Sequence, residues 1–212
     1  ANADAVTLTT DPATSVAIVI NVSNTDVTKV VTFAGDIENE DANSTLTINL
    51  LAVNSTVLSG DVATAGGAIS INLGAAGAVA TTHLLTVDTV SAQSLSIDGT
   101  IAAVEALDTA NLTILNTADG ADSVTFTKDI GGATAATALD DIAIGLDAND
   151  DALSVIFGAG VNAATIVIDG GGDAKNQTHS VKFGTAAATS TVTLSGAGLS
   201  GAGAGDTNNI TF

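Results

Sequence analysis

Apolar and polar residues alternate in short runs along most of the chain. The alternation is clearest in TLTINL at Thr45–Leu50, AISINL at Ala68–Leu73 and STVTLSG at Ser190–Gly196. A period of two bounded by Gly, Asn and Asp predicts β-strands that bury one face. Only TIAAVEALDT at Thr100–Thr109 has some helical character, and that segment is short. The pattern therefore predicts an all-β protein.

One short pattern recurs along the chain. VTFAGDI at Val31–Ile37 is nearly repeated as VTFTKDI at Val124–Ile130. The alignment of similar segments places an apolar residue at each of Leu8, Phe33, Leu58, Ile97, Phe126, Phe157, Phe183 and Phe212. Differences between these residue numbers give spacings of 25, 25, 39, 29, 31, 26 and 29 residues. A repeat of about 20–50 residues that holds one short unit is typical of a solenoid.

We interpret each copy as one coil of a parallel β-helix, with coils of about 25–31 residues. Short strands joined by turns would stack about 4.8 Å from the next coil and form ladders of Phe, Ile, Leu and Val. On this interpretation residues 1–212 form a single β-solenoid domain built from imperfect repeats. A β-sandwich is the alternative, because strands of similar composition look alike in sequence.

Composition limits the classes of partner. Hydrophobic residues make up 46% of the chain, but aromatic residues only 2%, and all five are Phe. Stacked rows of aliphatic side chains can fill a thin, layered core without large aromatics. The net charge of −19, with four Lys and no Arg, argues against nucleic acid, since few side chains could neutralise phosphates. No apolar run approaches the roughly 18 residues that span a bilayer, so we expect no membrane insertion.

The chain contains no Cys and no Met. It therefore has no disulfide or thiolate metal site, and it lacks the side chains that oxidise most easily. This composition suits long exposure outside a cell. The first residues, ANADAV, have neither a basic nor an apolar signal region, so we expect any signal peptide to have been removed. We expect an extracellular, cell-surface location.

A first group of candidate calcium ligands lies in DANDD. Asp147, Asn149 and Asp151 occupy positions one, three and five of an EF-hand-like loop. The match then fails, because Ala152 and Gly158 stand where that loop requires Gly and a bidentate Glu.

A second group lies in DIENED, where Asp36, Glu38 and Glu40 alternate. Carboxylates of this kind bind calcium, but Asp and Asn are also common in solvated turns. Calcium is therefore the one cofactor that the sequence suggests.

Six N-x-[ST] sequons are candidate N-glycosylation sites. They begin at Asn21, Asn43, Asn54, Asn111, Asn176 and Asn209. Several are expected by chance in a chain rich in Asn, Ser and Thr, and two of them, Asn111 and Asn209, lie in strand-like runs. Occupation also requires a producing cell that glycosylates secreted proteins.

Catalytic motifs are lacking. The two histidines are His83, which begins a predicted strand, and His179, which lies in NQTHS, a predicted loop. Glu105 and Asp108 could pair within the Thr100–Thr109 segment, although nearby surface carboxylates are usually only solvated. Polysaccharide lyases with a β-helix generally use an Arg or Lys base and aromatic sugar platforms, and this chain has no Arg, Trp or Tyr. We expect no enzymatic activity, with a polysaccharide-active β-helix enzyme as the remaining alternative.

The strings VTFAGDI, VTFTKDIGGATAATAL and ATIVIDGGGD resemble repeat regions of bacterial autotransporter surface antigens, including the rickettsial outer membrane protein B type. They also resemble β-solenoid stretches of some surface-layer proteins. The similarity covers most of the chain. It implies a right-handed parallel β-helix exposed at a cell surface.

The segment NNITF looks like a fragment of the repeat itself. It comprises the candidate assembly residues Asn208, Asn209, Ile210, Thr211 and Phe212. A solenoid edge presents unpaired backbone groups that can template another chain. We therefore expect a secreted structural protein that forms a homo-oligomer or polymer in a filament, sheath or surface layer. An adhesin or autotransporter-type passenger domain is the alternative.

Overall fold

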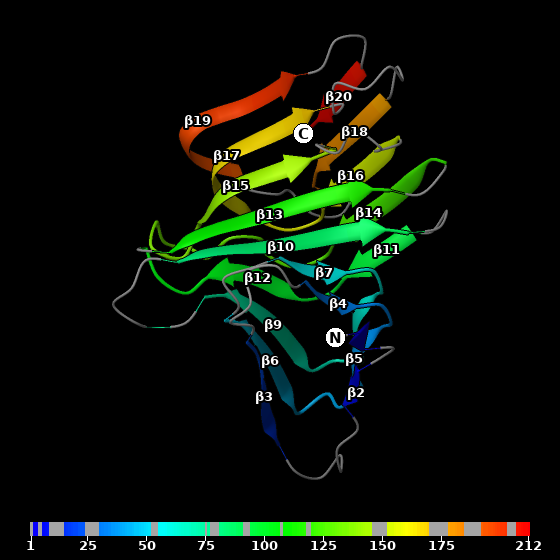
Figure 1. Cartoon of the computed structure of the whole chain (residues 1–212), viewed down its shortest axis with the longest axis vertical. Coiled ribbons are helices and arrows are strands. Elements are labelled where there is room, and N and C mark those ends of the chain that lie inside the picture. Colours follow the sequence, from blue (N-terminus) through cyan, green and yellow to red (C-terminus); the bar gives the residue numbers. More distant parts are fainter. Residues whose placement is uncertain are drawn as a thin grey trace.

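The chain forms a stack of short parallel strands. The computed structural model describes residues 2–3, 6–8, 15–23, 30–51, 55–74, 76, 81–90, 94–106, 108–117, 120–145, 152–169, 178–184, 192–202 and 207–212. Within these ranges the regular elements are all β-strands. Figure 1 shows these strands stacked along the long axis of the molecule. Where burial is described, their side chains alternate between buried positions and exposed or half-buried positions, as the sequence pattern predicts.

The strands belong to three parallel sheets. The first sheet contains β1 (Asn2–Ala3), β4 (Val31–Phe33), β7 (Thr56–Leu58), β10 (Thr82–Thr89), β13 (Thr109–Asn116), β15 (Leu139–Ile144), β17 (Val161–Asp169) and β19 (Val192–Ala202). The second contains β2 (Val6–Leu8), β5 (Ile37–Asn39), β8 (Val62–Thr64), β11 (Ser94–Ile97), β14 (Asp122–Phe126), β16 (Leu153–Phe157), β18 (Thr178–Phe183) and β20 (Thr207–Thr211). The third contains β3 (Ala17–Val22), β6 (Thr45–Leu50), β9 (Ala68–Leu73) and β12 (Thr100–Ala103).

The pairing pattern is that of a β-solenoid. β4 pairs with β7, β5 with β8 and β6 with β9, and every one of these pairs is parallel. The chain thus visits each sheet once before it returns to the first, in coils of about 28 residues. This confirms the predicted parallel β-helix, whereas a β-sandwich is usually built from antiparallel strands.

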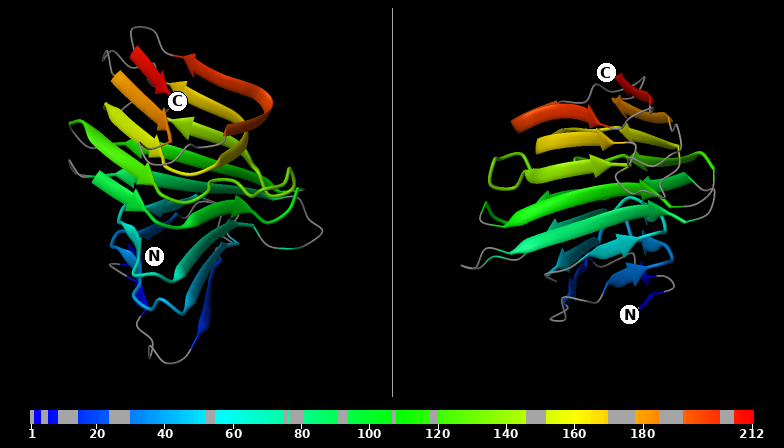
Figure 2. Two further views of the ribbon diagram at one scale, coloured as in Figure 1. Left: turned by 180° about the vertical axis from the view of Figure 1, so that it is seen from behind. Right: turned by 45° about the horizontal axis from the view of Figure 1, so that its top comes forward.

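The cross-section of the solenoid changes along its axis. The third sheet is four strands wide and includes β12 as its last strand. Within the described part of the chain, the third side continues beyond β12 as two bridges, from Ile101 to Ile130 and from Ile130 to Val161. Because Val161 is also the first residue of β17, the third side merges there with the first sheet. Coils near β3 therefore have three sheets, and coils near β20 have two (Figure 2).

The helical character expected in Thr100–Thr109 is wrong. Residues 100–103 form β12, which pairs in register with β9. Ile101 and Ala103 point into the core. Their burial against the strand of the previous coil outweighs the modest helix propensity of the Ala-rich segment, as tertiary context commonly does.

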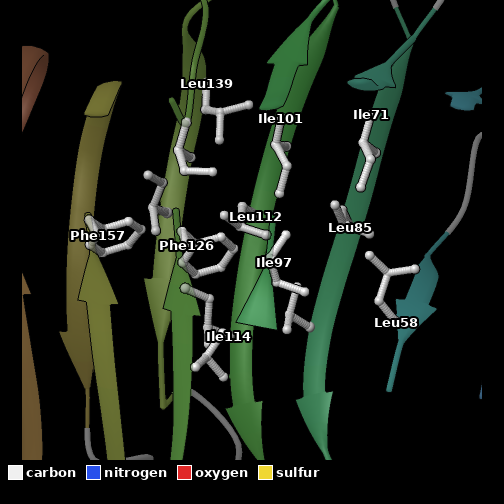
Figure 3. Packing of buried hydrophobic residues seen from close by; sticks show 14 of the residues in the cluster. Leu58, Ile71, Leu85, Ile97, Ile101, Leu112, Ile114, Phe126, Leu139 and Phe157 are labelled. Atoms are coloured by element: carbon white, nitrogen blue, oxygen red, sulfur yellow. The ribbon is translucent and has the colours of Figure 1, made fainter. Parts of the chain in front are cut away.

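Inner-face residues form ladders along the solenoid axis. In the second sheet the pairing runs from Ile97 to Phe126, Phe157 and Phe183. The Phe126 and Phe157 rings are stacked with centroids 5.2 Å apart, and the Phe157 and Phe183 rings with centroids 5.3 Å apart. Figure 3 shows Phe126 and Phe157 side by side within the core. Four of the five Phe residues thus share one column with Ile97, because Phe212 also stacks on Phe183.

The sequence alignment of the repeat is only partly correct. Phe33 pairs with Leu58 in the first sheet, but Ile97 pairs with Val62 in the second. The alignment therefore compares Leu58, in the first sheet, with Ile97, in the second sheet of the following coil. The spacing of 39 residues is long because it includes this extra step from one sheet to the next. VTFAGDI turns from the first sheet into the second, whereas VTFTKDI turns from the second toward the third, where Ile130 bridges Ile101.

The phenylalanine column predicts a large loss of stability on truncation. We expect Phe157→Ala to lower the free energy of unfolding by about 3–5 kcal/mol, because it leaves a cavity between two stacked rings. Urea denaturation followed by circular dichroism measures the change. Ser154→Ala on the outer face of the same strand is the control, and it should change stability by less than about 0.5 kcal/mol. A loss below about 1 kcal/mol for Phe157→Ala would contradict the assignment.

Candidate functional site

The outer edge of the second sheet exposes residues of the inner face. β20 pairs with β18, and Ile210 lies in register with the buried Val181. The Phe212 ring stacks on Phe183 with centroids 5.3 Å apart. Among the described strands, however, only β18 pairs with β20, and Ile210 is 37% exposed and Phe212 is 80% exposed. Two side chains of the core ladders therefore face solvent at this edge, which lies at the top in Figure 1.

The predicted assembly segment coincides with this edge. Its last residue is Phe212, and the other four lie on β20 itself. Asn209 and Thr211 are exposed on the outer face, and the amide of Asn208 donates a hydrogen bond to the Ile168 carbonyl. We call Ile210, Phe212 and the open backbone of β20 the β20 edge. An edge strand of this kind is able to pair with a further strand.

Aspartates at the corners connect neighbouring coils. Each of six Asp side chains accepts a backbone N–H from a residue 25–35 positions away, over 2.8–3.1 Å. They are Asp36, Asp61, Asp88, Asp108, Asp129 and Asp140. Six of the 23 acidic residues thus form coil-to-coil hydrogen bonds to backbone N–H groups, and composition alone did not reveal this use.

The predicted ligands in DIENED lie in two different hollows. Asp36 lines a hollow of about 270 Å³ together with Asp61. Glu38 and Glu40 line another hollow, of about 210 Å³. Within the described part of the chain, no three His, Cys, Asp or Glu side chains lie close enough to hold a metal ion by themselves. Calcium binding at Asp36, Glu38 and Glu40 stays a prediction.

The other predicted ligands, Asp147, Asn149 and Asp151, lie outside the described residues. The same holds for the sequon residues Asn54 and Asn176.

The described sequons differ in accessibility. Asn43 is exposed in a turn, and Asn209 is exposed on β20, whereas Asn111 is half-buried on β13. Asn21 is exposed on β3, but its side-chain oxygen accepts a hydrogen bond of 2.8 Å from the Asn49 amide. Asn43 therefore has the most accessible described sequon away from the β20 edge.

The two histidines lie on strands and are buried. His83 is on β10, as predicted, but His179 is on β18 and not in a loop. His179, Val181 and Phe183 alternate with exposed or half-buried residues and all point into the core. The alternation in HSVKF was the available signal, but the polar character of NQTH obscured it.

Asp98 joins three consecutive coils. Its carboxylate accepts hydrogen bonds from the hydroxyls of Thr64 and Thr127, and it lies 3.1 Å from the Lys128 ammonium. Partial burial raises the pKa of Asp98, but the hydrogen bonds from Thr127, Thr64 and Lys128 and the Lys128 charge outweigh it. The net effect is a pKa of Asp98 below its ordinary value.

The lowered pKa of Asp98 predicts an acid-sensitive contribution to stability. Between the folded and unfolded pKa values the unfolded chain binds more protons, so this contribution is present above about pH 4 and is lost as pH falls further. We expect Asp98→Asn to be less stable than the wild type at neutral pH and to have a flatter stability profile below about pH 4. Urea denaturation across pH 2–7 measures both effects.

Thr127→Val tests the cause of the pKa shift. It removes one hydrogen-bond donor and so brings the pKa of Asp98 in the folded protein closer to its ordinary value; the acid-induced loss should therefore become smaller and be complete at a higher pH than in the wild type. Identical profiles below pH 4 for wild type and Asp98→Asn would contradict the explanation.

No described segment is a helix long and apolar enough to cross a membrane. Comparisons of the chain with protein-family models, curated proteins and solved structures find no match.

Proposed function

We propose that the protein is a secreted structural subunit that assembles with copies of itself into an extracellular filament, sheath or surface layer. The observation that carries this proposal is the β20 edge. There a column of stacked core phenylalanines reaches β20, which pairs with no described strand other than β18, and Phe212 is 80% exposed. Burial of such a ring stabilises association, by about 25 cal/mol per Å² of apolar surface.

The partner in this proposal is the opposite side of the same two sheets in a second copy. β2 is the first strand of the second sheet, and β1 is the first strand of the first sheet. Strands of both sheets run parallel throughout, so β2 of one copy can follow β20 of another without reversal of direction. Val6 pairs with Ile37, at the far end of the ladder that reaches Phe212. The second copy would therefore place Val6 over Phe212.

The junction between two copies would involve two sheets, whereas the coil that contains β3 has three. No described third-sheet strand lies beyond β12, so β3 would remain uncovered at such a junction. This predicts a head-to-tail assembly, in which all copies point in the same direction. The first and second sheets would run continuously through each junction, and the third sheet would be interrupted there.

Composition and resemblance agree with the extracellular part of the proposal. The chain lacks Cys and Met and is strongly acidic. Its repeats resemble those of autotransporter passenger domains and surface-layer proteins, whose β-solenoids are exposed at cell surfaces. The proposal includes no enzymatic activity.

The β20 edge provides a matched test of assembly. Phe212→Asp places a charge on the inner face of the edge, and Thr211→Asp places the same charge one residue away on the outer face. We expect the wild type and Thr211→Asp to form large particles with rising concentration, and Phe212→Asp to remain monomeric. Light scattering and negative-stain microscopy measure this. A wild type that stays monomeric would contradict the proposal and favour the adhesin alternative.

Calcium is proposed as an aid to stability or assembly. Carboxylates of the acidic surface repel one another, and divalent cations bound between them would reduce that repulsion. We expect millimolar calcium to raise the melting temperature or the extent of assembly, and EDTA to reverse the effect. Equal melting temperatures and equal scattering with calcium and with EDTA would exclude this role.

A further inference from the structure

The outer face of the third sheet carries no charged side chain. Its strands β3, β6, β9 and β12, all of which the structure describes, contain no Asp, Glu, Lys, Arg or His. They lie side by side in the lower part of Figure 1. The other two sheets have acidic residues on their outer faces, among them Glu38, Asp88 and Asp141. In a chain with a net charge of −19, a second copy can therefore approach the third sheet without facing strand carboxylates.

Side chains on this face stand in columns that run from coil to coil. Asn21, Asn49 and Asn72 lie in register. The Asn49 amide donates a hydrogen bond to the Asn21 side-chain oxygen over 2.8 Å, and the Asn72 amide donates to the Asn49 oxygen over 2.9 Å. The neighbouring column consists of small uncharged side chains, which are Val19, Thr47, Ser70 and Thr100. Asn ladders and columns of similar side chains form the surfaces through which sheets pack face to face in cross-β assemblies.

The face has a protrusion at one side and a hollow at the other. Val19 is on β3, the first strand of the sheet, and is 57% exposed. The hollow has a volume of about 380 Å³, and Ala68, Ser70 and Thr100 of β9 and β12 are among its lining residues. A rotation of 180° about the strand direction brings β3 of one copy opposite β12 of another. The protruding valine then lies over the hollow.

We propose that the outer face of the third sheet binds the same face of a second copy, with the twofold axis along the strand direction. Each Val19 enters the hollow of the other copy. Thr47 then lies opposite Ser70 of the other copy, and Asn49 lies opposite Asn72. Hydroxyl and amide groups both donate and accept hydrogen bonds, so the two identical faces are complementary.

The contact is too small to hold two single chains together. Four strands that are about 4.8 Å apart and up to six residues long cover about 400 Å² per copy. A standard protein interface buries about 800 Å² per partner. Chains joined through their β20 edges present this face at every repeat, and linked weak contacts act together. Lateral pairing therefore rests on the proposed assembly.

The twofold geometry also defines the kind of assembly. It joins two filaments that run in opposite directions, because the rotation reverses the solenoid axis. A twofold contact closes on itself, so this face joins filaments in pairs and does not by itself extend them into a layer.

Two exposed valines provide a matched test. Val19→Asp places a carboxylate on the third-sheet face. Val90→Asp is the control, because Val90 is 51% exposed and lies next to the end of β10, away from this face. We expect the wild type and Val90→Asp to form paired filaments, and Val19→Asp to form single filaments of undiminished length. Negative-stain microscopy measures width and length, and circular dichroism checks that each variant is folded.

The outcomes separate lateral pairing from assembly itself. Val19→Asp assemblies as wide as those of the wild type, or single filaments in the wild type, would overturn the lateral contact and leave the proposed assembly intact. A wild type without filaments would overturn both.

Two further measurements complete the test. If Val19→Asp fails to fold, Ala68→Glu places the charge at the hollow instead, on an exposed residue, and should also give single filaments. Paired filaments of Ala68→Glu would overturn the proposal. Binding of the uncharged polysaccharide dextran by single wild-type filaments, lost in Val19→Asp, would assign the face to a carbohydrate and not to a second copy.

Discussion

The structure depends on parallel, in-register stacking of each coil on the one before it. In the described pairs, apart from the register shift between Ala163 and Thr165, an inner-face side chain lies against the side chain one coil away, so each ladder must be filled by residues of compatible shape. The column from Ile97 through Phe126 and Phe157 to Phe183 meets this condition, with ring centroids 5.2–5.3 Å apart. Stacked rings and aliphatic rows replace the bulky central core of a globular domain, which explains how a chain with only 2% aromatic residues folds.

The same stacking determines the role of the acidic residues. Where the chain turns a corner, backbone N–H groups lose their ladder partners and need other acceptors. A short carboxylate at the corner reaches the N–H of the adjacent coil, as Asp36 does for Asp61 and Asp129 does for Gly160. Asp98 goes further and joins hydroxyls from two coils to the Lys128 ammonium. A net charge of −19 is thus compatible with this fold, in which carboxylates such as those of Asp36, Asp98 and Asp129 act as hydrogen-bond acceptors between coils.

Because of this stacking, the residues with a possible function lie in two kinds of location. The first is an open edge, where Phe212 has a ring below it and solvent above it. The second is the outer face of a sheet, where residues of successive coils, such as Asn49 and Asn72, form columns. The proposed assembly uses the first location and the proposed lateral contact uses the second, so the two can be tested separately.

The sequence by itself determined the strand pattern, the solenoid and its approximate coil length. These features follow from alternation and from the recurrence of apolar positions, both of which are local properties of the chain. Only the tertiary structure decided which corner of the coil each repeat occupies. Two apolar residues four positions apart occur at more than one corner, as in Phe33 and Ile37 and in Phe126 and Ile130, so the sequence pattern does not distinguish the corners. The tertiary structure also decided that residues 100–103 form a strand and that His179 is buried, since burial against the neighbouring coil outweighs local preference. The asparagine column of the third sheet belongs to this second class, because the register between coils, and no local motif, brings its side chains together.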